Sequence, residues 1–263
     1  VATATDNDGG SASDSATVTV LNTAPTFSSA ASITPAAVYT GTTLTCTATA
    51  TDPDDGALTP SYVWTVGSTV IGTGGSYTVS ASDTDVGDSI TCTATAVDSD
   101  NETALSSTSV SILNTAPVLG AVSISPSPVY NDSVLTCSAS VSDPDEALSP
   151  LYAWTVAGAL VGTGSSLDLA TTASLPFDQV QCQVSVADSN GGSDNGSATV
   201  TVDNRAPLTP TVSISPSSPL DLDDLVCTGS SSDPDGSTVS ITLSWSSSAG
   251  ATVSGSTVSA TYT

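Results

Sequence analysis

Apolar and polar residues alternate along most of the chain, in short runs separated by turn-forming residues. The stretches "LTCTATA" (44–50) and "ITCTATAV" (90–97) place apolar residues at every second position and threonines between them. A period of two is typical of a strand with one buried and one exposed face. Asp-Pro, Gly-Ser and Asn-Gly clusters interrupt such runs about every 8 to 12 residues, which is the spacing of a β-sandwich. No period of 3.6 residues extends over a helical length, so we predict an all-β fold.

The same pattern recurs at intervals of about 90 residues. "NTAP" occurs at 22–25 and 114–117, and "NRAP" at 204–207. The stretch 38–66 matches 129–156, and 219–245 is a looser third copy. Repeats of this length indicate tandem domains.

We therefore predict four segments of one repeated domain. Residues 22–113 and 114–203 are complete β-sandwich domains, residues 1–21 are the last two strands of a partial domain, and residues 204–263 lack those two strands. Two arrangements would complete the partial domains. Either flanking repeats of a longer chain supply the strands, or residues 1–21 of one copy insert into residues 207–263 of the next. We favour flanking repeats, because Val1 aligns with the residue directly after a closing cysteine.

Five cysteines and three tryptophans follow the repeat. Their order is Cys46, Trp64, Cys92, then Cys137, Trp154, Cys182, then Cys227 and Trp245 with no closing cysteine. Cysteine on the second strand, tryptophan on the third and cysteine on the sixth resembles the immunoglobulin arrangement, in which the cysteines join the two sheets. The resemblance implies disulfides Cys46–Cys92 and Cys137–Cys182 and leaves Cys227 unpaired. The alternative is a set of reduced, buried cysteines, although a small-core β protein favours oxidation.

Longer motifs extend the resemblance. "DPDDGALTPSYVWTV" (52–66), "GDSITCTATAVDSDNET" (87–103) and the "NTAP" junctions resemble bacterial extracellular Ig-like repeats, and also the PKD-type repeats of bacterial surface proteins. The resemblance implies tandem immunoglobulin-like sandwiches arranged as a rod and used as a stalk, spacer or adhesin segment. The chain departs from PKD repeats in lacking a Gly-Asp-Gly turn after the tryptophan. It departs from antibody domains in having Ile90 and Val180 where those domains have a tyrosine.

Charge excludes several functions. The chain has 26 acidic residues, one basic residue (Arg205), no histidine and a net charge of −25. Such a polyanion is repelled by nucleic acid and by anionic lipid. No apolar run approaches membrane-spanning length, so we expect no direct membrane insertion. Without histidine or lysine no serine has a conventional base partner, and we expect no enzyme activity and no required cofactor.

Acidic residues gather in two loops of each repeat, and the immunoglobulin resemblance places these two loops at the same end of the domain. Calcium prefers six to eight oxygen ligands, so such loops are chemically plausible calcium sites. The candidate ligands are Asp52, Asp54, Asp98, Asp100, Asp143, Asp145 and Asp188. The alternative is ordinary turn chemistry, in which Asp side chains cap the backbone and bind no metal.

Serine and threonine make up 90 of the 263 residues. On exposed strand faces they are explained by β propensity alone. The functional alternative is covalent glycosylation, which also has three Asn-x-Ser/Thr sequons available. The candidate positions are Asn101, Asn131, Asn195, Thr45, Thr47 and Thr93.

Together these features predict a structural repeat segment of an extracellular or cell-surface bacterial fibre, stalk or adhesin. Its partners would be flanking repeats or neighbouring copies of the same protein. The alternative is a glycan- or protein-binding accessory module of a secreted adhesin or enzyme. A binding module needs exposed aromatic residues, and the best candidates are Tyr39 and Tyr130.

Overall fold

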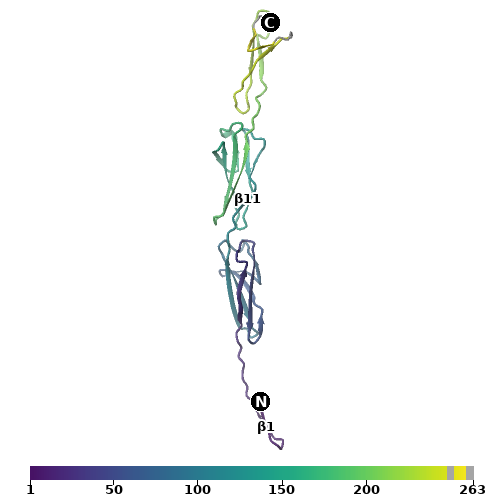
Figure 1. The fold of residues 1–263 in the computed structure, drawn as a ribbon, viewed down its shortest axis with the longest axis vertical. Helices are drawn as coiled ribbons and strands as arrows, with labels where there is room; N and C mark the ends of the chain where they lie inside the picture. The colour runs from purple at the N-terminus through teal and green to yellow at the C-terminus, as the bar shows by residue number, and fades with distance from the viewer. Residues whose placement is uncertain (248–251, 259–263) are drawn as a thin grey trace. The chain divides into compact units, whose positions relative to one another are not determined.

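A computed structural model describes residues 1–247 and 252–258 of the chain. Apart from one short 3₁₀ turn, its regular structure is β-strand, which confirms the predicted all-β class. The chain divides into two compact units (Figure 1). One comprises Val1–Thr115 with Asp143–Ala147, and the other Ala116–Ser142 with the described residues from Leu148 onward.

The first unit contains a complete two-sheet sandwich, which we call the first sandwich. One sheet consists of β3 (Thr26–Thr34), β4 (Thr43–Asp52), β5 (Gly56–Leu58) and β8 (Ser76–Thr78), with β4 pairing to the other three. The other sheet has the order β10-β9-β6-β7, formed by β6 (Ser61–Val66), β7 (Thr69–Thr73), β9 (Ser89–Val97) and β10 (Thr103–Ser111). This is the strand order of an immunoglobulin-like domain.

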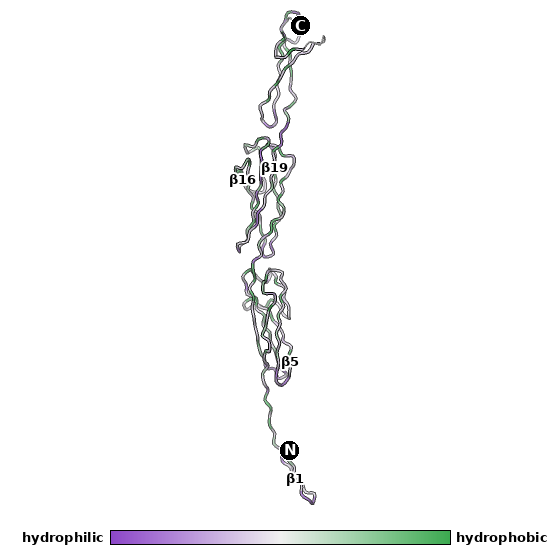
Figure 2. Tube along the Cα trace, in the orientation of Figure 1, coloured by the Kyte–Doolittle hydropathy of each residue, from purple (hydrophilic) through white to green (hydrophobic). Residues whose placement is uncertain are grey.

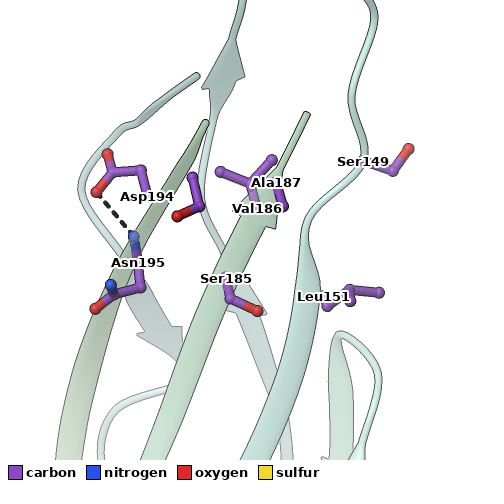
Figure 3. A pocket seen from close by; sticks show the side chains of 8 residues that line it. Ser149, Leu151, Ser185, Val186, Ala187, Asp194 and Asn195 are labelled. Atoms are coloured by element: carbon purple, nitrogen blue, oxygen red, sulfur yellow. Dashed lines mark hydrogen bonds between the residues drawn. The ribbon is translucent and has the colours of Figure 1, made fainter. Parts of the chain in front are cut away.

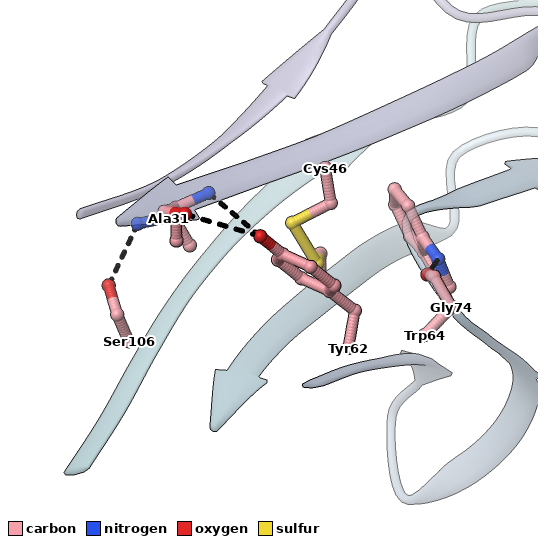
Figure 4. The surroundings of a disulfide bond; sticks show 8 residues. Ala31, Cys46, Tyr62, Trp64, Gly74 and Ser106 are labelled. Carbon is pink, nitrogen blue, oxygen red and sulfur yellow. Dashed lines mark hydrogen bonds between the residues drawn. A yellow bond between two sulfur atoms is a disulfide. The ribbon is translucent and has the colours of Figure 1, made fainter. Parts of the chain in front are cut away.

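Alternation along the strands builds the core. In β9 every second residue is buried, from Ile90 to Ala96, and Figure 2 shows the hydropathy changing along the strands. Trp64 is completely buried beside the disulfide between Cys46 and Cys92. Figure 4 shows how polar atoms in this core are satisfied: the Trp64 indole donates to the Gly74 carbonyl at 2.9 Å, and the Tyr62 hydroxyl bonds the backbone of strand β4.

The second unit begins with an equivalent sandwich, which we call the second sandwich. Its four-stranded sheet has the order β16-β15-β18-β19, formed by β15 (Leu151–Val156), β16 (Ala159–Thr163), β18 (Gln179–Ala187) and β19 (Ser193–Thr201). The remaining elements are β11 (Val118–Leu119), β12 (Ser123–Ser125), β13 (Val134–Ser138), β14 (Val141–Ser142), β17 (Ser166–Asp168) and the 3₁₀ turn η1 (Leu169–Thr171). Cys137 and Cys182 form the second disulfide, and Trp154 is fully buried near it.

The residues after the second sandwich form two smaller sheets. One joins β20 (Thr211–Ser215), β21 (Leu225–Ser230) and β24 (Thr257–Val258), and the other joins β22 (Ser244–Ser246) and β23 (Thr252–Ser254). Cys227 on β21 is buried and has no disulfide partner. In the described part of the chain β22 pairs only with β23, whereas β6 and β15 each pair on both sides. The domain boundaries, and the completion of the partial domains by other residues, stay predictions.

A short hairpin, β1 (Ala2–Thr5) with β2 (Ser11–Asp14), begins the first unit. Its turn is closed by the Asp6 N–H donating to the Gly10 carbonyl at 2.8 Å. The hairpins β9–β10 and β18–β19 close in the same way, through the backbone N–H groups of Asp98 and Asp188. The three hairpins are therefore versions of one repeated element.

Candidate functional site: the acidic turns at the linkers

The first aspartate of each Asp-Pro-Asp turn caps its own backbone. Asp52 Oδ1 accepts the N–H groups of Asp54 at 2.7 Å and Asp55 at 3.0 Å. Asp143 and Asp233 cap their turns in the same way. Such bonds satisfy backbone donors that the end of the strand leaves unpaired. These aspartates thus do the work that ordinary turn chemistry predicts for them.

The second aspartate of each turn holds the linker that enters the domain. Its Oδ2 atom accepts the backbone N–H of the second linker residue in all three copies. The pairs are Thr23 with Asp54 at 2.8 Å, Thr115 with Asp145 at 2.7 Å, and Arg205 with Asp235 at 2.5 Å. We call this contact the linker clamp. Sequence reasoning missed it, although the pairs lie at nearly constant separations of 31, 30 and 30 residues.

The second acidic loop of the first sandwich joins the same cluster. Asp98 Oδ1 accepts the N–H groups of Asp100 and Glu102, and Oδ2 accepts the Asn22 side-chain amide at 3.0 Å. The Asn22 amide is the main cause that lowers the pKa of Asp98 below its ordinary value. Asp55 bridges the two loops by accepting from the backbone and hydroxyl of Ser99. The structure thus brings together the two loops that the sequence predicts to be neighbours.

The equivalent loops at Asp188 and Asp6 repeat part of this arrangement. Asp188 Oδ1 accepts the N–H groups of Asn190 at 2.9 Å and Gly192 at 2.7 Å. Asp6 Oδ1 accepts those of Asp8 and Gly10. A capping aspartate at the start of this loop is therefore a constant feature of the repeat.

Two buried carboxylate oxygens accept no hydrogen bond from the residues that the structure describes. They are Oδ2 of Asp52 and Oδ2 of Asp143, and Asp52 is only 4% exposed. A buried carboxylate oxygen without a partner is costly. The described residues nevertheless contain no group of three or more acidic, cysteine or histidine side chains arranged to hold a metal ion. A calcium ion at these loops stays a prediction.

Arg205, the only basic residue, makes the third clamp different from the others. Besides its backbone N–H, its guanidinium donates to Asp235 Oδ1 at 2.8 Å, Asp132 Oδ2 at 2.9 Å and Asn131 Oδ1 at 2.8 Å. It also lies over the Tyr130 ring, with its central carbon 4.9 Å from the ring centroid. One side chain therefore joins the 130–132 turn of the second sandwich to the Asp-Pro-Asp turn of the following sheets.

This network shifts the titration of its members. The hydrogen bonds that the guanidinium donates to Asp132 and Asp235 raise the pKa of Arg205 above its ordinary value. Burial alone would raise the pKa of Asp235, but the backbone and guanidinium bonds of Arg205 outweigh it and lower that pKa. Both groups therefore stay charged over a wider pH range than they would in isolation.

The candidate glycosylation positions differ in access. Asn101 and Asn195 are exposed, as are Thr45 and Thr47 on strand β4, while Thr93 on β9 is partly buried. Asn131 is engaged, because its side-chain amide donates to the Asp235 carbonyl at 2.9 Å. The structure therefore leaves two of the three sequons open.

The candidate binding surfaces differ in access and in composition. Tyr39 is 40% exposed, but Tyr130 lies under the Arg205 guanidinium, so the two recurring tyrosines are not equivalent. Figure 3 shows a pocket on the outer face of the second sandwich that contains no aromatic side chain. It is lined by Ser149, Leu151, Ser185, Val186, Ala187, Ser193, Asp194 and Asn195.

Comparisons with known proteins give structural similarity only. No protein-family model matches the chain, and no curated protein matches it. Among solved structures, a tetra-tandem repeat from the extending region of a large adhesion protein has 21% identity and a TM-score of 0.33, and the match covers 98% of this chain and 68% of that one. A 1.5-MDa bacterial ice-binding adhesin has 17% identity and a TM-score of 0.32, covering 89% and 96%. Fibronectin(III)-like modules of Clostridium thermocellum CbhA have 19% identity and a TM-score of 0.26, covering 68% and 94%.

Within residues 1–247 and 252–258, no helix is long and apolar enough to cross a membrane.

Proposed function

We propose that this chain is an extender segment of an extracellular bacterial fibre, stalk or adhesin, which provides reach, spacing and surface display without catalysis. The observation that carries the proposal is the linker clamp, which occurs three times at equivalent positions. A spacer needs every domain to hold its entering linker in the same way. A catalytic or binding site does not by itself require this repetition.

The cysteines support an extracellular place for this function. Both disulfides join the two sheets of a sandwich, and disulfides persist in oxidising surroundings. We infer that the partners of the segment are further repeats of the same kind, either in the same chain or in neighbouring copies.

Small-angle scattering tests the extender role. A variant with Asp54→Ala, Asp145→Ala and Asp235→Ala loses all three clamp acceptors, so we expect its maximum dimension and radius of gyration to fall as the linkers become flexible. The control carries Asp8→Ala, Asp14→Ala and Asp221→Ala, which removes the same charge from exposed positions. Scattering profiles that coincide for the two variants would contradict the proposal.

Calcium at the acidic loops is the second part of the proposal. The buried Oδ2 atoms of Asp52 and Asp143 support it, because a calcium ion would satisfy them. We expect chelation to lower the melting temperature of the native chain and calcium to restore it. Asp52→Asn should reduce that calcium dependence. A melting temperature that is the same in chelator and in calcium would leave these residues only their capping role.

Glycosylation at the open positions is the third part. Asn101, Asn195, Thr45 and Thr47 are exposed, which favours them as attachment sites. Thr93 is only partly buried and remains a candidate, because the alternation along strand β9 places it on the face opposite the buried residues. The intact mass of the native chain tests it, since each attached glycan adds a discrete increment. A mass equal to that of the polypeptide with two disulfides would exclude it.

A second candidate function is a glycan- or protein-binding module. The pocket on the second sandwich favours it, because Leu151 is exposed there beside polar groups of Ser185 and Asn195. A glycan array with the native chain and with Leu151→Ala tests it. Signals that the substitution abolishes would favour binding, and an array without signals would favour the extender role.

A further inference from the structure

The chain offers one site to proteases that cut after basic residues. Its only lysine or arginine is Arg205, followed by Ala206, so a trypsin-like protease can hydrolyse only the Arg205–Ala206 bond. Such proteases must take the basic side chain into a pocket with an acidic residue at its base. Cleavage therefore requires the Arg205 guanidinium to leave its present partners.

Those partners come from two sides of the linker. Asn131 and Asp132 belong to a turn of the second sandwich, and Asp235 belongs to the turn after β21. The Asp235 side chain is fully buried, and the Arg205 side chain is 25% exposed. The Asn131 amide closes the ring by donating to the Asp235 carbonyl.

We propose that Arg205 is a latch that keeps this single cleavage site closed while it fastens the second sandwich to the sheets that follow. A guanidinium suits the role, because its planar fork can bind two carboxylates and an amide at once while it stacks on Tyr130. The backbone N–H of Arg205 is held by Asp235 as well, so the scissile segment is fixed at both its backbone and its side chain.

Trypsin cleavage of the folded chain measures latch opening directly. Both disulfides lie before residue 205, so one cut releases residues 206–263 as a separate fragment. The rate is normalised to that of the peptide "TVDNRAPLT" (201–209) under the same conditions. We expect the chain to be cut at least about tenfold more slowly than the peptide, because cleavage follows the population of the open form.

Three variants measure how much each contact of Arg205 slows the cleavage. Asp235→Asn should accelerate cleavage by about tenfold, since it weakens a buried charge-assisted pair. Asp132→Asn should accelerate it by about threefold, because the Asp132 side chain is 59% exposed and exposed pairs are weak. Arg205→Lys keeps a trypsin site but loses the fork, so it should also be cut faster than the native chain. Added salt should speed the cleavage of the native chain relative to the peptide.

Asp14→Asn is the matched control, since it removes one charge from the exposed hairpin and touches none of these groups. Circular dichroism should show that Asp132→Asn leaves the fold intact. If Asp235→Asn unfolds the C-terminal sheets, the cleavage rate of Asp132→Asn alone tests the latch. Cleavage of the native chain at the rate of the peptide would overturn the latch, as would equal rates for Asp132→Asn and Asp14→Asn. The test is independent of the extender role, because it reports on Arg205 whatever the chain does.

Discussion

The linkers Asn114–Pro117 and Asn204–Pro207 start from almost the same four residues but are held differently. In both, the second residue donates its backbone N–H to the second aspartate of an Asp-Pro-Asp turn. In the linker 114–117 that residue is Thr115, and the other oxygen of Asp145 accepts the Thr40 hydroxyl at 2.5 Å. In the linker 204–207 it is Arg205, and Asp235 also accepts the guanidinium.

The comparison separates what the repeat requires from what one position adds. The backbone contact is common to all three copies, so it depends on the Asp-Pro-Asp turn and not on the linker side chain. Further contacts then differ between the two linkers. The Arg205 guanidinium reaches two carboxylates and an amide, whereas the additional contact of Asp145 comes from the Thr40 hydroxyl, which lies outside the linker. A single substitution in a linker can thus add contacts at that linker while the linker clamp itself stays the same.

Removing a disulfide should have the largest effect, and it tests how much the cross-link stabilises the sandwich next to the Arg205 linker. Cys137→Ala with Cys182→Ala opens a cross-link between residues 45 apart in the sandwich that carries Asn131 and Asp132. We expect the free energy of unfolding of that sandwich to fall by about 4 kcal/mol on the chain-entropy model. Denaturant unfolding measures it. Cys227→Ala is the control, because it breaks no cross-link. Equal losses for the two variants would show that the disulfide is not what stabilises the sandwich.

The clamps at Asp145 and Asp235 can be broken separately. Asp145→Ala leaves the Thr115 N–H without its acceptor, and Asp235→Ala does the same to the Arg205 N–H while it also removes one of the two carboxylates that bind the guanidinium. Hydrogen exchange should accelerate about tenfold at the Thr115 amide and by more at the Arg205 amide, since Asp235→Ala also removes the charge-assisted bond from the Arg205 side chain. NMR measures the exchange of both amides in both variants. In each variant the amide whose acceptor is intact serves as the control. Equal acceleration at the two amides would show that the guanidinium adds nothing to the clamp.

The sequence was sufficient for the fold because the fold depends on periodic signals. Alternation over residues 90–97 corresponds to strand β9, and tryptophans at the expected positions are the fully buried Trp64 and Trp154. Strand β5 was not predicted, because the three residues Gly56–Leu58 are too few to show a period.

The site was predicted less completely, because it depends on the directions of individual side chains. The acidic loops were identified as neighbours, but which carboxylate oxygen would meet a linker N–H cannot be read from composition. Arg205 was visible only as a lone base, and its reach to Asp132 and Tyr130 depends on a tertiary contact. For the same reason the sequence alone does not show that Tyr130 lies under the Arg205 guanidinium or that the Asn131 amide donates to the Asp235 carbonyl.

The linker at Asn22 sharpens the comparison with the smallest expected effect. There the first linker residue contributes its own side chain, which donates to Asp98 and lowers the pKa of that carboxyl. Because the folded pKa lies below the unfolded value near 3.9, the ionised group contributes stability above that pH, and the contribution is lost as pH falls through the lowered folded pKa. Asn22→Ala should move the pKa of Asp98 back toward its ordinary value and make the first sandwich less sensitive to acid between these two pKa values. NMR titration of the Asp98 carboxyl carbon measures the shift, with Asp194, whose pKa is lowered by the Leu119 N–H, as an internal reference that Asn22→Ala leaves in place. An unchanged Asp98 titration in Asn22→Ala would mean that the loop backbone alone sets this pKa, and that the Asn22 side chain, unlike that of Arg205, adds no electrostatic contact to its joint.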